Sequence, residues 1–262
     1  MSSEQTASTR DRTRDAPSMT DSNNFSLIAT LRPDDIAGLT YEMVQPSEAL
    51  LGPPPLLVLL HGAGSNEHDL LGLTPYLDGR CCMVSVRAPY QNGAGGFAWY
   101  RTAYTASGAM IDEEQEAASR DVLARFVSEI VRERGAHPAN VYLLGFSQGA
   151  TMALSLLLSE PGRYAGAMAF GARLLPQISG RVARRDLLKG KPLLLGHGVL
   201  DDVVPVARAR GVRSFLLDAG LDLDYREYAT GHDIPGAALR DAAAWLSARL
   251  ENASLAPRVL QS

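Results

Sequence analysis

The chain has 262 residues, a formal charge of −4 at neutral pH and 46% hydrophobic residues. This weak acidic balance gives no sign of a nucleic-acid-binding or membrane-binding surface, so we expect no nucleic-acid partner. No apolar run approaches the ~20 residues that a membrane-spanning helix requires. The alternation of strand and helix patterns is unbroken from residue 55 to residue 250, which favours one α/β domain over two smaller ones.

Two tails flank the predicted domain, which covers residues 25–250. Residues 1–24 are rich in Ser, Thr, Asp and Arg and contain almost no large apolar side chain. We therefore expect a disordered N-terminal tail, not a secretory signal or an acid-poor transit peptide. Residues 251–262 form the predicted C-terminal tail.

The chain's two cysteines, Cys81 and Cys82, are neighbours in the sequence. Adjacent cysteines are badly placed for an unstrained disulfide. Their apolar surroundings favour reduced, mostly buried thiols in a cytoplasmic protein, with a redox role as the weaker alternative.

Along the chain, strand patterns alternate with helical ones. The predicted strands cover residues 25–32, 39–44, 56–60, 82–86, 141–145, 165–170, 193–197 and 222–228. The predicted helices cover residues 67–77, 113–134, 148–159, 205–219 and 235–250. The first two strands end at prolines and are expected to be antiparallel edge strands, whereas the later apolar runs are typical of strands buried on both faces. The pattern predicts a mostly parallel eight-stranded sheet with helices on both faces.

Two connections between these elements bear on function. Residues 87–111 form a long segment rich in glycine and aromatic residues, and loops of that length are uncommon unless they are functional. Phe97, Trp99 and Tyr100 are candidates for the wall of a substrate pocket, and the alternative is that they pack the segment onto the sheet. Residues 171–192 are too few to fold as a cap domain, so we expect an open site. The basic residues of that connection form a solvated face or attract an anionic headgroup or leaving group.

The most informative motif is Gly-Phe-Ser-Gln-Gly at residues 145–149. A short apolar strand precedes it and a leucine-rich helix follows it, which is the context of a nucleophile elbow. In such a turn the backbone of Ser147 is strained and its hydroxyl is exposed, while Gly145 and Gly149 provide the space that the turn needs. The pattern therefore predicts that Ser147 is a catalytic nucleophile.

A serine hydroxyl needs a base, and the base needs an orienting carboxylate. Candidates follow later in the chain, in the order acid and then histidine. Asp201 and Asp202 come just after the strand at 193–197, and His232 lies in a turn between the last strand and the last helix. Each candidate lies beyond the carboxyl end of a strand, where open α/β sheets place their sites.

A glycine-rich turn, His-Gly-Ala-Gly-Ser at residues 61–65, follows the buried strand at 56–60. We assign an oxyanion hole to the backbone N–H groups of Ala63 and Gln148. For His61 and His197, each followed by a glycine at a strand end, we favour hydrogen bonds to the backbone of the turn over catalysis.

Several of these stretches together resemble the bacterial carboxylesterase, phospholipase and acyl-protein thioesterase family of α/β-hydrolases. The matching stretches are residues 61–64, 69–70, 95–100, 145–150, 197–205 and 231–232. The resemblance implies the α/β-hydrolase fold, here without a large cap domain because residues 171–192 are too few for one, and hydrolysis of carboxylic esters or thioesters without a cofactor or metal. It also implies that Asp201, three residues after a glycine in His-Gly-x-x-Asp-x-Val-x-Pro, is the acid. Val199 stands where the thioesterase branch often has Asp, which weakens the case for an acyl-protein substrate.

We therefore predict a serine esterase that cleaves carboxylic esters, with thioesters or lysophospholipids as further candidate substrates. The alternatives are a hydrolase-fold binding or receptor protein with little turnover, and a peptidase or acyltransferase that uses the same triad. The missing cap favours short and medium acyl esters over emulsified triglycerides. A homodimer is left open.

Overall fold

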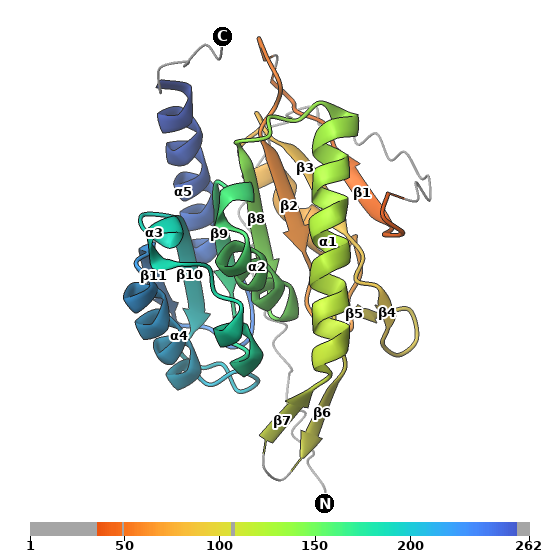
Figure 1. Ribbon diagram of the computed structural model, residues 1–262, viewed down its shortest axis with the longest axis vertical. Helices are drawn as coiled ribbons and strands as arrows, with labels where there is room; N and C mark the ends of the chain where they lie inside the picture. The colour runs from red at the N-terminus through yellow and green to blue at the C-terminus, as the bar shows by residue number, and fades with distance from the viewer. Residues whose placement is uncertain (1–35, 49, 106–107, 256–262) are drawn as a thin grey trace, which may run out of the picture.

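The computed structural model describes residues 36–48, 50–105 and 108–255 (Figure 1). The N-terminal tail and the strand expected at residues 25–32 lie outside these residues. The last helix continues to Leu255, five residues beyond the predicted domain boundary, and residues 256–262 again lie outside the described part.

One twisted sheet organises the fold, and its strands run in the order β1-β3-β2-β8-β9-β10-β11. These strands are β1 (Tyr41–Val44), β2 (Leu56–Leu60), β3 (Cys82–Val86), β8 (Val141–Phe146), β9 (Gly166–Phe170), β10 (Pro192–Gly198) and β11 (Asp222–Tyr228). Only β1 pairs antiparallel, with β3, and every other pair is parallel. The mostly parallel sheet is confirmed, with seven strands among the described residues.

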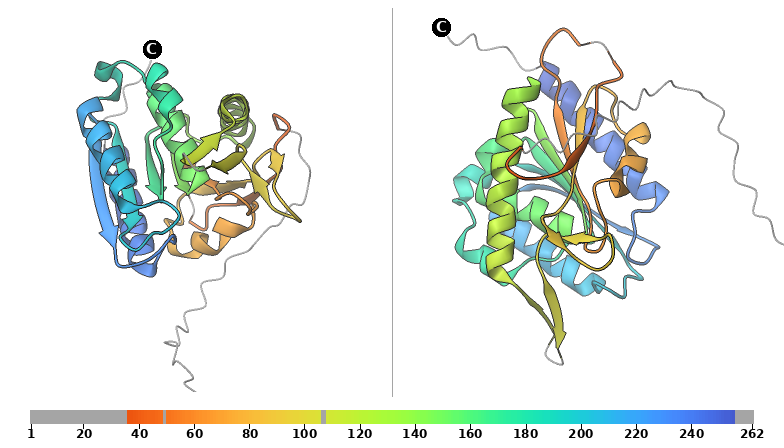
Figure 2. Two further views of the ribbon diagram at one scale, coloured as in Figure 1. Left: turned by 90° about the horizontal axis from the view of Figure 1, so that it is seen from below. Right: turned by 90° about the vertical axis from the view of Figure 1, so that its right-hand side faces the viewer.

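Helices cover both faces of this sheet, as the right-hand view of Figure 2 shows. They are α1 (Glu113–Arg134), α2 (Gln148–Ser159), α3 (Arg185–Leu188), α4 (Val206–Ala219) and α5 (Gly236–Leu255), with 3₁₀ turns η1 (Asp69–Tyr76), η2 (Pro161–Arg163) and η3 (Pro176–Gly180). One buried cluster joins α1, α2 and α4 to the sheet, and a second joins η1 and α5 to the opposite face. No helix in the described ranges is both long enough and apolar enough to cross a lipid bilayer.

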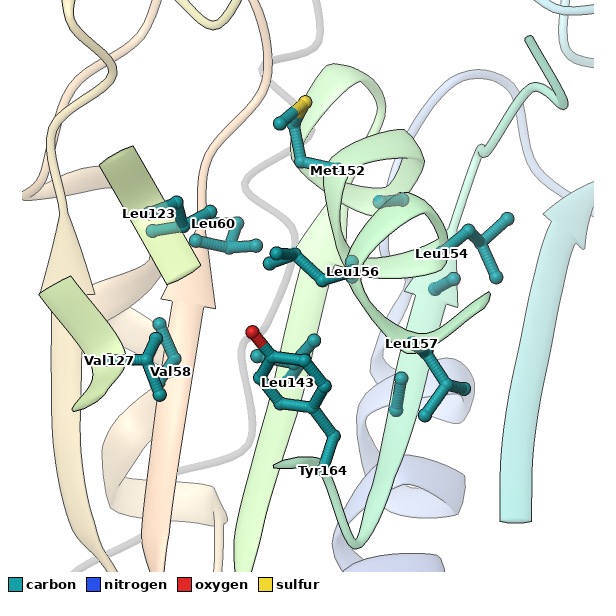
Figure 3. Packing of buried hydrophobic residues seen from close by; sticks show 14 of the residues in the cluster. Val58, Leu60, Leu123, Val127, Leu143, Met152, Leu154, Leu156, Leu157 and Tyr164 are labelled. Atoms are coloured by element: carbon teal, nitrogen blue, oxygen red, sulfur yellow. The ribbon is translucent and has the colours of Figure 1, made fainter. Parts of the chain in front are cut away.

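The alternation of side chains along β2 explains the two clusters. Val58 and Leu60 belong to the first cluster and Leu57 and Leu59 to the second, and all of them are fully buried. Figure 3 shows Leu123 and Val127 of α1 against that first face. A strand buried on both faces reads as a continuous apolar run, which is why the Leu-Leu-Val-Leu-Leu segment was recognisable in the sequence.

Helix α1 begins and ends where its sequence signals indicate. The Asp112 carboxylate accepts a hydrogen bond from the Gln115 N–H at 3.0 Å, which caps the first turn. Gly135 ends the helix in the left-handed region, with φ of 63°. By contrast, the helix expected at residues 67–77 is the 3₁₀ turn η1, which has Pro75 inside it.

The long segment at residues 87–111 is not a plain loop. It contains two small hairpins, β4 (Tyr90–Gln91) with β5 (Phe97–Ala98) and β6 (Thr102–Thr105) with β7 (Gly108–Ile111). In Figure 1 the second hairpin projects beyond the end of the sheet to which the parallel strands point. The connection between β9 and β10 holds only η3 and α3.

Both cysteines are buried and free, as the sequence predicts. Burial raises the pKa of the Cys81 thiol to about 12 and that of Cys82 to about 11. Because the thiolate is the reactive form, both groups are chemically inert near neutral pH.

Candidate active site

The turn between β8 and α2 places Ser147 in a strained backbone conformation. Its φ is 53° and its ψ is −114°, a combination that a residue with a side chain rarely adopts. A Cβ atom on Gly145 would collide with the backbone of Gly149, and one on Gly149 would collide with the Leu60 carbonyl of the neighbouring strand. The two glycines are therefore required by close packing, and the turn lifts the Ser147 hydroxyl away from the sheet.

A chain of hydrogen bonds links the three residues that the sequence singled out. The Ser147 Oγ lies 2.9 Å from Nε2 of His232. Nδ1 of the same ring lies 2.7 Å from Oδ2 of Asp201. The residues follow β8, β10 and β11, so the parallel strands bring together groups that are 85 and 31 residues apart.

The carboxylate of Asp201 is almost fully buried, with 1% of its side chain exposed. Its second oxygen, Oδ1, accepts hydrogen bonds from the N–H groups of Val203 and Val204 at 2.9 and 2.7 Å. Burial alone would raise the pKa of the Asp201 carboxyl, but the bonds from Val204 and His232 outweigh it and hold this pKa below its ordinary value. The group therefore stays ionised beside the imidazole.

The neighbouring carboxylates have other environments. Asp202 is exposed, and Asp233 accepts a hydrogen bond from the Ile234 N–H at 2.7 Å. The N–H groups of Val203 and Val204, which lead into α4, donate to Asp201 and not to Asp202.

Two further histidines hold turns in place. His61 Nδ1–H donates to the Gly62 carbonyl at 2.7 Å, and its Nε2 accepts from the Ala88 N–H at 3.0 Å. Burial lowers the pKa of His61, which suits this neutral tautomer. His197 Nε2–H donates to the Val204 carbonyl at 2.6 Å and lies 3.3 Å from Asp201 Oδ2. His197 thus supports the turn that carries the acid, a contact that spacing alone did not reveal.

The two N–H groups assigned to the oxyanion hole both belong to residues that face the cavity around Ser147. The Ala63 N–H has no hydrogen-bond partner within the described ranges. Gln148 is the first residue of α2, where backbone N–H groups have no partner inside the helix. Both groups can therefore donate to an oxygen atom bound above Ser147.

The side chain of Gln148 has a role that the sequence analysis missed. Its Oε1 accepts from the Trp99 N–H at 3.0 Å, and its Nε2 donates to the Tyr100 carbonyl at 2.9 Å and lies 3.3 Å from Thr102 Oγ1. One amide thereby ties residues 99–102 to the nucleophile turn. The available signal was a polar side chain at the first position of an otherwise apolar helix.

The aromatic candidates of the 87–111 segment separate into two groups. Tyr100 lines the cavity, which has a volume of about 1430 Å³. Trp99 is fully buried, and its Nε1–H donates to the His61 carbonyl at 2.9 Å. Phe97 lies under the Arg87 guanidinium, 4.6 Å from the ring centroid. Trp99 and Phe97 are not part of the cavity wall, so they fit the alternative that aromatic residues pack the segment onto the fold.

A metal-binding group is a separate question. The structure shows no cluster of three or more His, Cys, Asp or Glu side chains that could hold a metal ion within residues 36–48, 50–105 and 108–255.

Comparison with known proteins adds a family to this geometry. Residues 44–250 match the model of a family described as Phospholipase/Carboxylesterase. The chain is 27% identical over 191 residues to the putative hydrolase MhqD of Bacillus subtilis, covering 72% of this chain and 91% of that protein. It is 28% identical over 215 residues to acyl-protein thioesterase 1 of Eremothecium gossypii, covering 77% and 90%.

Solved structures agree with the family match. The crystal structure of esterase PE8 superposes with a TM-score of 0.71 at 29% identity, covering 80% of this chain and 98% of that one. The Bacillus cereus carboxylesterase superposes with a TM-score of 0.70 over 80% and 94%, and at 24% identity it supports the fold alone. The predicted α/β-hydrolase fold is confirmed. Since the family match spans most of the described residues, the chain belongs to the phospholipase/carboxylesterase family and is a hydrolase of the esterase class.

Proposed function

We propose that the protein cleaves carboxylic esters through an acyl-enzyme on Ser147, with His232 as general base and acid and Asp201 as the orienting carboxylate. The observation that carries this proposal is the continuous hydrogen-bonded chain from Ser147 Oγ through His232 to Asp201, located at a large cavity. Relay geometry of this kind turns a weak hydroxyl nucleophile into a reactive one.

The proposed reaction has two balanced halves. His232 Nε2 takes the proton of Ser147 while Oγ attacks the ester carbon, and the carbonyl oxygen becomes an oxyanion that accepts from the N–H groups of Ala63 and Gln148. His232 then gives its proton to the departing alcohol oxygen as the acyl-enzyme forms. In the second half, water replaces the alcohol, and the acid leaves with Ser147 restored.

The surroundings of the cavity bear on the substrate class. Only η3 and α3 lie between β9 and β10, so nothing in this connection forms a lid domain over Ser147. We propose short and medium acyl esters in solution as substrates, with thioesters and lysophospholipids as less favoured candidates. The similar proteins include one named an acyl-protein thioesterase and one named an esterase, so their names do not favour thioesters over esters. A cytoplasmic location belongs to the same proposal, since free thiols at Cys81 and Cys82 suit a reducing compartment.

The test is covalent labelling together with turnover. A fluorophosphonate probe should label Ser147 with one equivalent, and Ser147→Ala should abolish both labelling and hydrolysis of 4-nitrophenyl butyrate without lowering the melting temperature. Ser214→Ala is the matched control, because its hydroxyl bonds the Arg210 carbonyl on the exposed side of α4. Labelling at another residue, or activity that survives in Ser147→Ala, would refute Ser147 as the nucleophile. A wild-type protein that neither reacts with the probe nor hydrolyses the ester would favour a binding protein.

A further inference from the structure

The charges that line the cavity do not match those of the whole chain. The chain carries a formal charge of −4, yet the cavity wall has three arginines, Arg101, Arg173 and Arg208, against one carboxylate, Glu113. None of these four side chains forms an ion pair with another described residue. Several arginines outside the cavity are ion-paired, as Arg210 is with Glu227.

The two sides of the cavity differ in charge. Arg101 and Glu113 lie near the β6–β7 hairpin and the start of α1, where their charges offset each other. Arg173 follows β9, and Arg208 lies in the first turns of α4, on a side that lacks a lining carboxylate. Two acids precede α4, the exposed Asp202 and Asp201, which is buried and bonded to His232, and neither lines the cavity. The α4 side of the cavity is therefore positively charged.

Arg173 is fixed close to the reacting atoms. Its N–H donates to Thr151 Oγ1 at 3.2 Å, and the Thr151 hydroxyl donates to the Ser147 carbonyl at 3.2 Å. Its guanidinium donates from Nη2 to the Val203 carbonyl at 2.9 Å, two residues from Asp201. A Cβ atom on Gly171, two residues before Arg173, would lie 3.0 Å from the His232 ring. The guanidinium is thus held beside the triad with further N–H groups left to donate.

Gln177 adds an unsatisfied polar group to the same cavity. Its side chain lines the cavity, and neither amide atom has a hydrogen-bond partner in the described part of the chain, although both are buried. Buried amide groups are almost always hydrogen-bonded in folded proteins. A bound polar group would provide the acceptor and donor that Gln177 lacks.

From these observations we propose that the preferred ester carries a negative charge, as a carboxylate or a phosphate, which binds Arg173 and Arg208 on the α4 side of the cavity. This inference rests on the proposed ester hydrolysis and specifies its substrate class. Arginine suits the task because its fork of N–H groups matches the oxygens of carboxylate and phosphate. The charge sits either in the acyl chain or in the leaving alcohol, and the test separates the two.

The experiment compares esters that differ in charge. Monoethyl glutarate is paired with ethyl pentanoate to place the charge in the acyl chain. Acetylglycerol phosphate is paired with acetylglycerol to place it in the alcohol. In one arm or the other, kcat/KM for the anionic member should exceed that of its neutral partner about tenfold, the effect of one hydrogen bond to a charged group. Raising the salt concentration should reduce this ratio, because ions screen an accessible pair.

Variants identify the residues responsible. Arg208→Gln and Arg173→Gln should each lower the anionic-to-neutral ratio severalfold, Arg173→Lys should retain part of it, and Arg208→Glu should bring it below one. Since Arg173 also supports the acid turn, the ratio is the readout that isolates charge recognition from a general loss of rate. Arg125→Gln, on the exposed side of α1, is the matched control and should leave the ratio unchanged.

The experiment gives different results when only the anionic preference is wrong and when ester hydrolysis itself is wrong. If both arms give a ratio of one or less, or if Arg173→Gln and Arg208→Gln leave it unchanged, the anionic substrate is refuted while Ser147-dependent hydrolysis stands. If none of the four esters is hydrolysed, the proposed function and this inference fall together.

Discussion

The turns that carry Ser147, Asp201 and His232 and the segment at residues 87–111 enclose the same cavity but are held in place by different means. Main-chain bonds fix the turns: the Ser147 N–H donates to the Phe170 carbonyl at 2.8 Å, and the Leu200 N–H to the Thr230 carbonyl at 2.9 Å. The 87–111 segment has main-chain bonds of its own at Phe97, but residues 99 and 100 are attached by side-chain bonds, chiefly those of Gln148 and the Trp99 indole. The proposed catalytic residues therefore lie in turns defined by the backbone, and the part of the cavity wall near Tyr100 lies in a region that single substitutions can loosen.

The largest expected effect separates two adjacent acids in one of these turns. Asp201→Asn should lower kcat about 10⁴-fold, because an amide in place of the carboxylate leaves the imidazole in the wrong tautomer. Asp202→Asn, at an exposed neighbour, should keep most of the turnover. Steady-state kinetics on 4-nitrophenyl butyrate checks both variants, with melting temperatures to show that they fold. The reverse pattern would move the acid to Asp202.

A steric change tests the nucleophile turn itself. Gly149→Ala places a Cβ atom against the Leu60 carbonyl, so strand and turn must separate. We expect a loss of about 3 kcal/mol or more in the free energy of unfolding, together with most of the activity. Gly72→Ala is the control, since a Cβ there meets nothing within 4 Å. Denaturant unfolding measures the stability of both variants. Wild-type stability in Gly149→Ala would show that the close packing is not rigid.

The pocket wall is tested at Gln148. Gln148→Ala removes the bonds to Trp99, Tyr100 and Thr102 but keeps the backbone N–H assigned to the oxyanion hole. We expect kcat/KM to fall about tenfold, the equivalent of one or two lost hydrogen bonds. Hydrogen exchange at residues 99–102 should become faster.

Gln115→Ala is the matched control for that change. Gln115 Oε1 accepts the Arg101 N–H at 2.9 Å in an exposed position, where water can replace it. Equal effects of the two alanine variants would mean that Gln148 has no special part in holding the wall.

The smallest effect is expected far from the cavity, at Asp78. Burial alone would raise the pKa of this carboxyl, but hydrogen bonds from Arg80 and Ser247 lower it to about 2. The ionised form is therefore favoured in the fold, and its stabilisation is present above about pH 4 and is lost as the pH falls through about 2. Asp78→Asn should cost about 1–2 kcal/mol at neutral pH without changing kcat.

The pH series checks the sign of this effect. The gap in unfolding free energy between wild type and Asp78→Asn should narrow as the pH falls from about 4 to about 2, because both chains are then neutral at this position. A gap that widens in acid would contradict the low pKa of Asp78.

Features with a local sequence pattern could be predicted, and features that depend on long-range contacts could not. The buried strands were recognisable as apolar runs, and Ser147 was recognisable because its motif is local. Asp201, Asp202 and His232 were candidates because each follows a strand, and the choice of Asp201 over Asp202 came from the family resemblance. The two hairpins of the 87–111 segment were not predicted, although their strands pair locally. The Gln148 bonds were not predicted because they join residues 46 to 49 positions apart with no local signature. The charge difference across the cavity likewise appears only when Arg173 and Arg208, far apart in sequence, line one side.

The backbone conformation of Ser147 also limits which residues could replace it. A φ of 53° is tolerable for an unbranched side chain but is a severe outlier for a β-branched one. Threonine, which shares the hydroxyl, would therefore clash in this turn, whereas cysteine has the same branching as serine and fits. During evolution this turn would therefore permit the replacement of serine by cysteine but not by threonine, although threonine has the more similar functional group.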